Sequence, residues 1–251
     1  MKNSRLSHEF THSFPAIRGI QAGREYYVAM CPLKFLPAMF RNGGNDLFPE
    51  LRAQREMNKG RIPPITQYLL DNPDTYVFSA IAASVDGEVY FDAYGTDLIG
   101  NKIGSLCIPM DAQFIINDGQ HRLAAIKSAL KENPALQYET ISMVLYVDAG
   151  LTRSQQMFAD LNRYAVRPTK SLNILYDHRD PMARLCHKLV DEIPVFKGMT
   201  EKAKSSISNR SRKLFTLSSI YQATKRLLRK KDGELIAPDE EALAFDFWNT
   251  V

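Results

Sequence analysis

The 251-residue chain has few cysteines, no long apolar run and no apolar signal-peptide core near its N-terminus. Its three cysteines, Cys31, Cys107 and Cys186, are widely spaced and form no C-x-x-C pair, which argues against a disulfide framework and a self-contained zinc or iron–sulfur site. The best apolar run, residues 78–85, is far shorter than the roughly 20 residues that a membrane-spanning helix needs. These absences favour a cytoplasmic protein without a membrane segment or a bound metal.

Common catalytic and nucleotide-binding motifs are also missing. The sequence contains no G-x-S-x-G, Walker A or G-x-G-x-x-G pattern, so it gives no support for a standard hydrolase, a P-loop protein or a dinucleotide-binding protein. Hydrophobic residues make up 45% of the chain and charged residues 24%, as in an ordinary globular protein. The length fits one large domain or two small ones.

The net charge of +4 conceals a strong asymmetry along the chain. Residues 197–231 contain eleven Lys and Arg and one acidic residue, a charge of +10, whereas residues 232–251 contain six acidic residues and no basic one, a charge of −6. The first 196 residues sum to zero. Concentrated positive charge is typical of a protein that binds a phosphate backbone, although a solvated helix face is the alternative.

The first two thirds of the chain alternate between strand-like and helical patterns. Alternating or buried apolar runs predict strands at residues 14–21, 25–31, 76–85, 88–94, 103–108, 113–117 and 141–147. Helical spacing predicts helices at residues 32–40, 49–58, 64–70 and 123–130, and another that Thr152 caps. The sequence therefore predicts a mixed α/β domain over residues 1–167.

Beyond residue 168 the strand signal disappears. Helices are expected at residues 171–176, 181–192, 217–231 and 240–251, the first three with Ser171, Asp180 and Thr216 as N-caps. This predicts a helical, basic, DNA-binding part over residues 168–251, either separate from the first domain or packed with it as one continuous unit. The last helix has no C-terminal cap, so we expect the natural chain to continue past Val251 with an element used in packing or in a homo-oligomer.

The most informative motif is the pentad Asp118-Gly119-Gln120-His121-Arg122, which lies between an apolar strand and a helix. Such a junction directs backbone N–H groups and the positive end of the helix dipole toward an anion. Gly119 permits close backbone approach, Arg122 can bind phosphate with two donors, and His121 can transfer a proton near neutral pH. Asp118 either caps the helix or holds a metal ion, a ribose or a base edge. On residue types alone, an Asp-Gly turn that only caps a helix is an equal alternative.

The pentad, with the following Leu123-Ala124-Ala125, resembles the signature of the DGQHR-domain family, and within it the DndB family of DNA sulfur modification proteins. The strand–loop–helix is also similar, more distantly, to the phosphate-binding loop of the ParB/sulfiredoxin superfamily, whose Gly-x-x-Arg arrangement Gly119 and Arg122 match. Gln120 stands where sulfiredoxin has its reactive cysteine, which excludes sulfinic-acid reduction at this site. The resemblance covers most of residues 14–230 and includes residues 26–33, 158–172 and 175–180.

This resemblance implies a ParB/sulfiredoxin-like α/β body and a DNA-binding regulator that represses the genes of bacterial DNA phosphorothioation. The implied partners are double-stranded DNA and other phosphorothioation proteins. The superfamily further implies a nucleoside triphosphate with Mg²⁺ at the DGQHR loop. The alternative is an enzyme, a nucleotide hydrolase or a DNA-nicking enzyme, in which Asp118 holds a metal or orients water, His121 moves a proton and Arg122 stabilises phosphate charge.

Two further segments carry unbalanced positive charge. The connector before the helical part is interpreted as a second anion-binding loop, which extends the phosphate or nucleotide site through Asn162, Arg163, Arg167 and Lys170. A solvated linker is the alternative. The second segment, where serines and an asparagine alternate with bases, is interpreted as the DNA-backbone contact through Lys202, Lys204, Arg210, Arg212 and Lys213.

Cys31 ends a predicted strand beside aromatic residues. It is a candidate for an exposed, redox-responsive thiol close to the DNA. A small buried hydrophobic residue is the more common role for such a cysteine.

Overall fold

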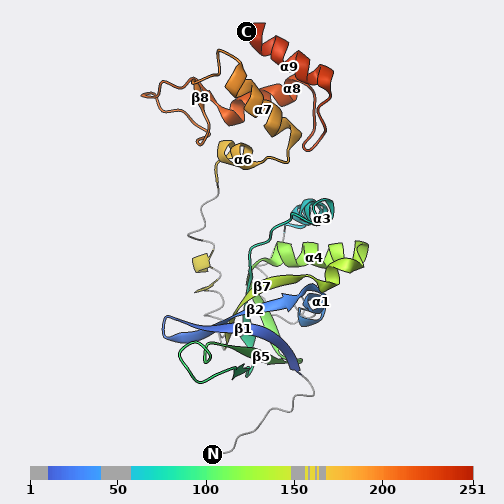
Figure 1. Cartoon of the computed structure of the whole chain (residues 1–251), viewed down its shortest axis with the longest axis vertical. Helices are drawn as coiled ribbons and strands as arrows, with labels where there is room; N and C mark the ends of the chain where they lie inside the picture. Colours follow the sequence, from blue (N-terminus) through green and yellow to red (C-terminus); the bar gives the residue numbers. More distant parts are fainter. Residues whose placement is uncertain are drawn as a thin grey trace, which may run out of the picture. The chain divides into compact units, whose positions relative to one another are not determined.

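The computed structural model describes residues 11–40, 58–147, 156–157, 159–161, 163 and 168–250, and it divides the chain into two compact units, residues 1–165 and 166–251 (Figure 1). Each unit has a hydrophobic core of its own. Within the described part of the chain, no helix is long and apolar enough to cross a membrane.

A seven-stranded sheet forms the first unit, with the strand order β4-β5-β1-β2-β7-β3-β6. All neighbouring strands are antiparallel except β3 and β7, which are parallel. The strands are β1 (Thr11–Gln21), β2 (Arg24–Pro32), β3 (Ile81–Asp86), β4 (Tyr90–Ala93), β5 (Ile103–Pro109), β6 (Gln113–Asp118) and β7 (Thr140–Val147). Each of the seven predicted strand segments therefore contains a strand, and the mixed α/β class is confirmed.

The hairpin between β1 and β2 depends on a two-residue turn. Ala22 and Gly23 both adopt positive φ, 51° and 73°, which is the conformation that matches the twist of a tight hairpin. The turn fixes the register so that Ala16 lies opposite Ala29 and Ile17 opposite Val28. Ala16 and Ala29 are buried and Ile17 is exposed, so the turn determines which residues of the hairpin face the core.

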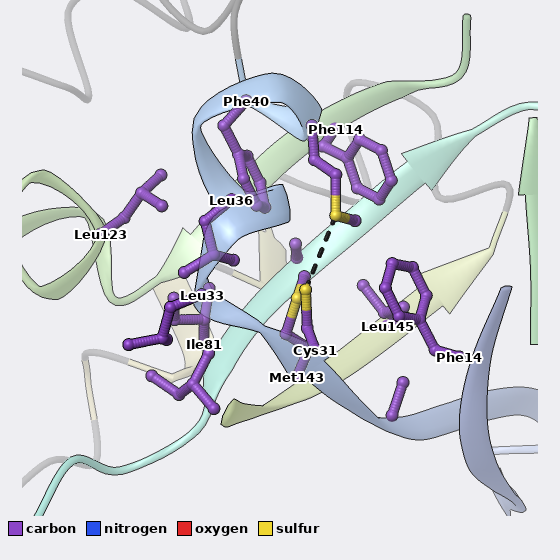
Figure 2. Packing of buried hydrophobic residues seen from close by; sticks show 14 of the residues in the cluster. Phe14, Cys31, Leu33, Leu36, Phe40, Ile81, Phe114, Leu123, Met143 and Leu145 are labelled. Carbon is purple, nitrogen blue, oxygen red and sulfur yellow. Dashed lines mark hydrogen bonds between the residues drawn. The ribbon is translucent and has the colours of Figure 1, made fainter. Parts of the chain in front are cut away.

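Helices cover one face of this sheet (Figure 1). They are α1 (Leu36–Met39), α3 (Ile62–Asp71) and α4 (Gln120–Glu132), with short 3₁₀ helices η2 (Leu33–Phe35), η3 (Lys59–Arg61) and η4 (Pro134–Tyr138). Their apolar side chains pack on those of the strands, as Leu36, Leu123 and Met143 show in Figure 2. The helix predicted over residues 49–58, apart from its last residue, and the Thr152 cap lie outside the described residues.

The second unit is mainly helical. It contains α6 (Lys170–Tyr176), α7 (Pro181–Glu192), α8 (Leu217–Leu227) and α9 (Pro238–Thr250), together with the two-residue parallel strands β8 (Thr200–Glu201) and β9 (Phe215–Thr216). The expectation of no strands after residue 168 was therefore wrong in this detail. The predicted caps of α7 and α8 are confirmed, because Asp180 accepts from Met182 N–H and Thr216 from Ser219 N–H.

Two predicted helix boundaries in this unit were wrong. The N-cap of α6 is Thr169, whose hydroxyl accepts from Leu172 N–H, and not Ser171, which is the second residue of the helix. The helix predicted to continue to residue 231 ends at Leu227, because Arg229 adopts a left-handed conformation with φ of 53°.

Candidate functional site

The DGQHR turn joins the end of β6 to the start of α4. Gly119 is the N-cap residue, with φ of 100°, and no side chain caps the helix. Of the two roles predicted for Asp118, the capping role is therefore not observed. A Cβ atom at residue 119 would lie 2.9 Å from Nη2 of Arg122 and 3.2 Å from Cγ1 of Ile81, so both the backbone angle and the crowding favour glycine.

Arg122 is bound within the fold. Its Nη2 donates to Oδ2 of Asp118 at 2.6 Å and to the carbonyl oxygen of Ala80 at 3.1 Å, and its Nη1 donates to the hydroxyl of Ser79. The side chain is only 20% exposed. The guanidinium thus fastens the start of α4 to the end of β6 and to the segment that leads into β3. In this arrangement Arg122 holds the turn in shape instead of presenting its fork to solvent.

His121 is partly buried beside this turn. Burial lowers the pKa of its imidazole below the usual 6.5, and the positive charge of Arg61 lowers it further. Its Nε2 atom is buried and has no hydrogen-bond partner among the described residues. The first backbone N–H groups of a helix also lack intrahelical partners. Nε of Arg122 is likewise buried without a partner in the described part of the chain, so the unpartnered polar groups of the turn are these two side-chain nitrogens and the first N–H groups of α4.

A metal site is not formed by the residues that the structure describes, since none of them gather into a group of three or more His, Cys, Asp and Glu. The Asp118 carboxylate is about half exposed and is paired with Arg122. An Mg²⁺ ion at this turn would need oxygen ligands from a bound phosphate or water in addition to Asp118.

The connector residues predicted as a second anion-binding loop are only partly described. Asn162 and Arg167 lie outside the described residues, Arg163 is exposed, and Lys170 is the exposed first residue of α6. Arg163 belongs to the first unit and Lys170 to the second. A shared phosphate site with the DGQHR turn therefore stays a prediction.

Residues 202–214 form a loop between β8 and β9, here called the basic loop, which extends away from the helices of the second unit (Figure 1). A turn closes its tip, where Ser211 N–H donates to the carbonyl oxygen of Ser208 at 2.8 Å. All five predicted DNA-contacting residues lie in this loop.

The five bases differ in whether their side chains already have a partner within the fold. Lys202 pairs with Asp191 at 2.8 Å, and Nζ of Lys213 donates to the carbonyl oxygen of Gly198 at 2.7 Å. The other three bases of the loop, Lys204, Arg210 and Arg212, are exposed and form no ion pair within the described residues, although the pKa of Glu201 is lowered by the backbone N–H groups of Ala203 and Lys204 and, to a smaller extent, by the charge of Lys204. These three cations remain available to a bound anion.

Two of the five bases in residues 225–231 pair with acidic residues that follow them. Lys225 forms an ion pair with Asp232, and Lys230 forms one with Glu240 at 2.7 Å. A third acidic residue of this segment, Glu241, pairs with Lys188 of α7 at 2.6 Å, whereas Arg226, Arg229 and Lys231 are exposed and form no ion pair within the described residues. The adjacency of the two charge blocks was the signal in the sequence for the pairing of Lys225 and Lys230.

Cys31 lies in the core of the first unit and not at the surface. It is 0% exposed, and its Sγ atom lies 3.7 Å from Sδ of Met39 (Figure 2). Burial raises the pKa of the Cys31 thiol to about 12. The expected exposed thiol is not observed, and the structure instead shows the alternative role, a small buried hydrophobic residue.

Sequence reasoning missed a set of hydroxyl groups at the base of the basic loop. Ser171 was predicted only as a helix cap, but its hydroxyl is buried against Ser218, and its backbone N–H bonds to Ser205 in the loop. The abundance of serine between residues 205 and 219 was the available signal. Which of these hydroxyls meet depends on how α6 packs against α8, and local spacing does not specify that packing.

Comparison with known proteins gives one match. No curated protein and no solved structure matches the chain significantly. The family model described as DndB, DNA-sulfur modification-associated, matches residues 14–251. That range contains both the DGQHR turn and the basic loop, and it covers nearly the whole chain. The predicted resemblance is thus confirmed: the chain belongs to the DndB family of proteins associated with DNA sulfur modification.

Proposed function

We propose that the chain is a cytoplasmic DNA-binding regulator of bacterial DNA phosphorothioation, which represses the modification genes and contacts duplex DNA through the basic loop. The observation that carries this proposal is the group of exposed cations in the basic loop that form no ion pair within the described residues, Lys204, Arg210 and Arg212. Serine and asparagine side chains lie between them and can donate to phosphate oxygens. The family match supports a role in DNA sulfur modification, and the loop supplies the chemistry for a DNA partner.

The test of this DNA contact compares the loss of unpaired cations in the basic loop with the loss of cations that already form ion pairs. In the double variant Arg210→Gln/Arg212→Gln we expect duplex affinity to fall about 10- to 100-fold, and the slope of log K against log salt to become shallower by about 2. The matched control is Lys225→Gln/Lys230→Gln, which removes the same formal charge from cations already paired with Asp232 and Glu240. Affinity should change several-fold less in the control, as measured by fluorescence anisotropy over a salt series.

Regulation requires more than backbone contacts. A repressor must prefer its operator, so a fragment from the promoter of the modification genes should bind at least about 1000-fold more tightly than random duplex at the same salt concentration. Equal affinities for the two duplexes would contradict the regulatory role and leave a nonspecific DNA-binding protein.

A second candidate function is nucleotide binding at the DGQHR turn, either as a switch or for hydrolysis or DNA nicking. It is favoured by the buried, unpartnered Nε2 of His121 beside the free N–H groups at the start of α4. The experiment is a calorimetric titration with ATP, CTP and GTP in the presence of Mg²⁺, with and without DNA. His121→Ala should weaken binding and any turnover. Arg122 variants are less informative, because Arg122 also holds the turn together.

A further inference from the structure

Buried hydroxyl groups join the start of α6 to the start of α8. Ser171 is 0% exposed, and its Oγ donates to Oγ of Ser218 at 3.0 Å and accepts from the backbone N–H of Ser218 at 3.2 Å. The Ser218 hydroxyl in turn lies 3.2 Å from that of Thr216, the N-cap of α8. These contacts fix the first turns of the two helices relative to each other within the second unit.

The N-terminal end of α6 also binds the first segment of the basic loop, residues 203–205. The backbone N–H of Ser171 donates to Oγ of Ser205 at 3.1 Å, and the Thr169 hydroxyl donates to the carbonyl oxygen of Ala203. The Glu201 carboxylate accepts from the N–H groups of Ala203 at 2.9 Å and Lys204 at 3.1 Å. Three separate partners therefore fix the backbone of residues 203 and 204 and the side chain of Ser205.

Hydrogen bonds also fix the last segment of the loop, residues 213 and 214. Leu214 N–H donates to the carbonyl oxygen of Met199 at 2.8 Å, and Nζ of Lys213 donates to that of Gly198 at 2.7 Å. Hydrogen bonds therefore fix both ends of the loop, residues 203–205 and 213–214. Residues 206–212 project beyond these bonds. That stretch contains Arg210 and Arg212, and Lys204 lies in the first fixed end.

We propose that Ser171 and Ser205 position the basic loop for DNA binding: Ser205 ties the loop to the backbone N–H of Ser171, and the Ser171 hydroxyl fixes that end of α6 against α8 through Ser218, so that with this brace the loop meets the DNA in one preformed shape. This inference rests on the proposed function of the loop. Ordering a flexible segment at the moment of binding opposes association, and a segment that is already ordered avoids that cost. Ser171 carries no charge, so it acts on affinity only through the conformation of the loop.

Two variants open the brace from opposite sides. Ser171→Ala keeps the N–H that binds Ser205 but removes the hydroxyl that fixes this end of α6 against α8, and Ser205→Ala removes the acceptor in the loop itself. Because Ser205 is exposed, its substitution leaves the core of the unit unchanged even if Ser171→Ala destabilises the fold. The matched control is Ser219→Ala. The Ser219 hydroxyl accepts from the backbone N–H of Thr216 at 3.2 Å in the capping box of α8 and donates to the Thr216 carbonyl oxygen at 2.8 Å, with no bond to residues 202–214 among the described residues.

Two readouts test the brace independently. Trypsin should cleave the folded protein within the loop, after Lys204, Arg210 or Arg212, about tenfold faster in both brace variants than in the wild type, because cleavage requires an opened segment. Duplex affinity should fall about fivefold with the slope against salt unchanged, since no phosphate-binding cation is lost. Ser219→Ala should lower the melting temperature but leave both readouts near the wild-type values.

The outcomes separate this inference from the proposed function. Wild-type cleavage rates and affinities in folded Ser171→Ala and Ser205→Ala would overturn the positioning role. A shallower salt slope in those variants would also overturn it, because that result indicates lost phosphate contacts. If Arg210→Gln/Arg212→Gln binds DNA as the wild type does, the loop is not the DNA contact and the proposed function fails, whereas the protease readout still reports whether the brace exists.

Discussion

The DGQHR turn and the basic loop both carry arginine in a polar segment, yet the structure uses the two in opposite ways. At the turn, the Arg122 guanidinium donates to Asp118, Ser79 and Ala80. In the basic loop, Arg210 and Arg212 are exposed and have no acidic partner within the described residues. The same side chain thus stabilises one segment and remains available for binding in the other.

The comparison teaches that the partners of a cation, and not its presence in the sequence, determine what it can bind. The second unit repeats this lesson within one charge block, where the +10 segment contains paired lysines at the end of α8 and unpaired arginines in the basic loop. Only charge that remains unpaired can release counterions from DNA when the protein binds.

The largest effect on stability is expected from Arg122→Ala. The change removes three hydrogen bonds and leaves the Asp118 carboxylate and the Ala80 carbonyl without their donor, so the free energy of unfolding should fall by about 2 to 3 kcal/mol. Arg210→Ala should change it by less than about 0.5 kcal/mol, because it removes only an exposed side chain. Urea denaturation of the two variants measures the difference.

Arg122→Lys sharpens this comparison. Lysine keeps the charge but cannot reach three acceptors with a planar fork, so it should restore only part of the lost stability. The contrast between turn and loop would break down if Arg122→Ala and Arg210→Ala proved equally stable, since Arg122 would then be as available for a ligand as the loop arginines.

A somewhat smaller effect is expected from Gly119→Ala. A side chain at residue 119 meets both an unfavourable φ of 100° and the fixed guanidinium of Arg122, which should cost about 2 kcal/mol in total. The control is Gly233→Ala, at a φ of 77° with no atom within 4 Å of the added Cβ. This control should cost only the backbone strain, about 1 kcal/mol.

Thermal unfolding of Gly119→Ala and Gly233→Ala gives the loss of stability at each glycine. The difference between the two losses measures the steric crowding around Arg122. Equal costs at the two glycines would show that Arg122 moves aside freely. That result would contradict the proposed role of Arg122 in fixing the turn.

Local chemistry made much of the fold predictable. The hairpin of β1 and β2, the strand before Asp118 and the caps at Asp180 and Thr216 all depend on neighbouring residues, and all appear in the structure. The errors came where a distant partner competes with the local one. Ser171 has the residue type of a cap, but its hydroxyl bonds to Ser218 across 47 positions of sequence, and the capping role passes to Thr169.

The candidate site was predictable to the same extent. The location of the DGQHR turn and of the basic loop followed from glycine and charge in the sequence. The contact of Arg122 with Asp118 has the spacing of a helical i,i+4 pair and could have been expected, whereas its bonds to Ser79 and Ala80 depend on how β3 pairs with β6. The burial of Cys31 likewise depends on the helices that cover the sheet, and its sequence neighbours do not reveal it.

The smallest effect concerns the protonation of His121. It should make the stability that the turn provides depend on pH, whereas DNA binding by the loop should not depend on it. Because burial and Arg61 lower the pKa of His121 in the folded chain, the unfolded chain binds a proton first as the pH falls below the usual value of 6.5. The contribution of His121 to stability should therefore be constant above that pH and decrease below it, until the folded state is also protonated. The pKa of His12 is also lowered, so its titration affects stability in the same direction. The measurement is therefore the difference in the free energy of unfolding between the wild type and His121→Gln, which should change with pH only below pH 6.5. The basic loop contains no histidine, so duplex affinity of the folded protein should not follow this titration. A pH dependence of DNA binding that disappears in His121→Gln would contradict this separation of turn and loop.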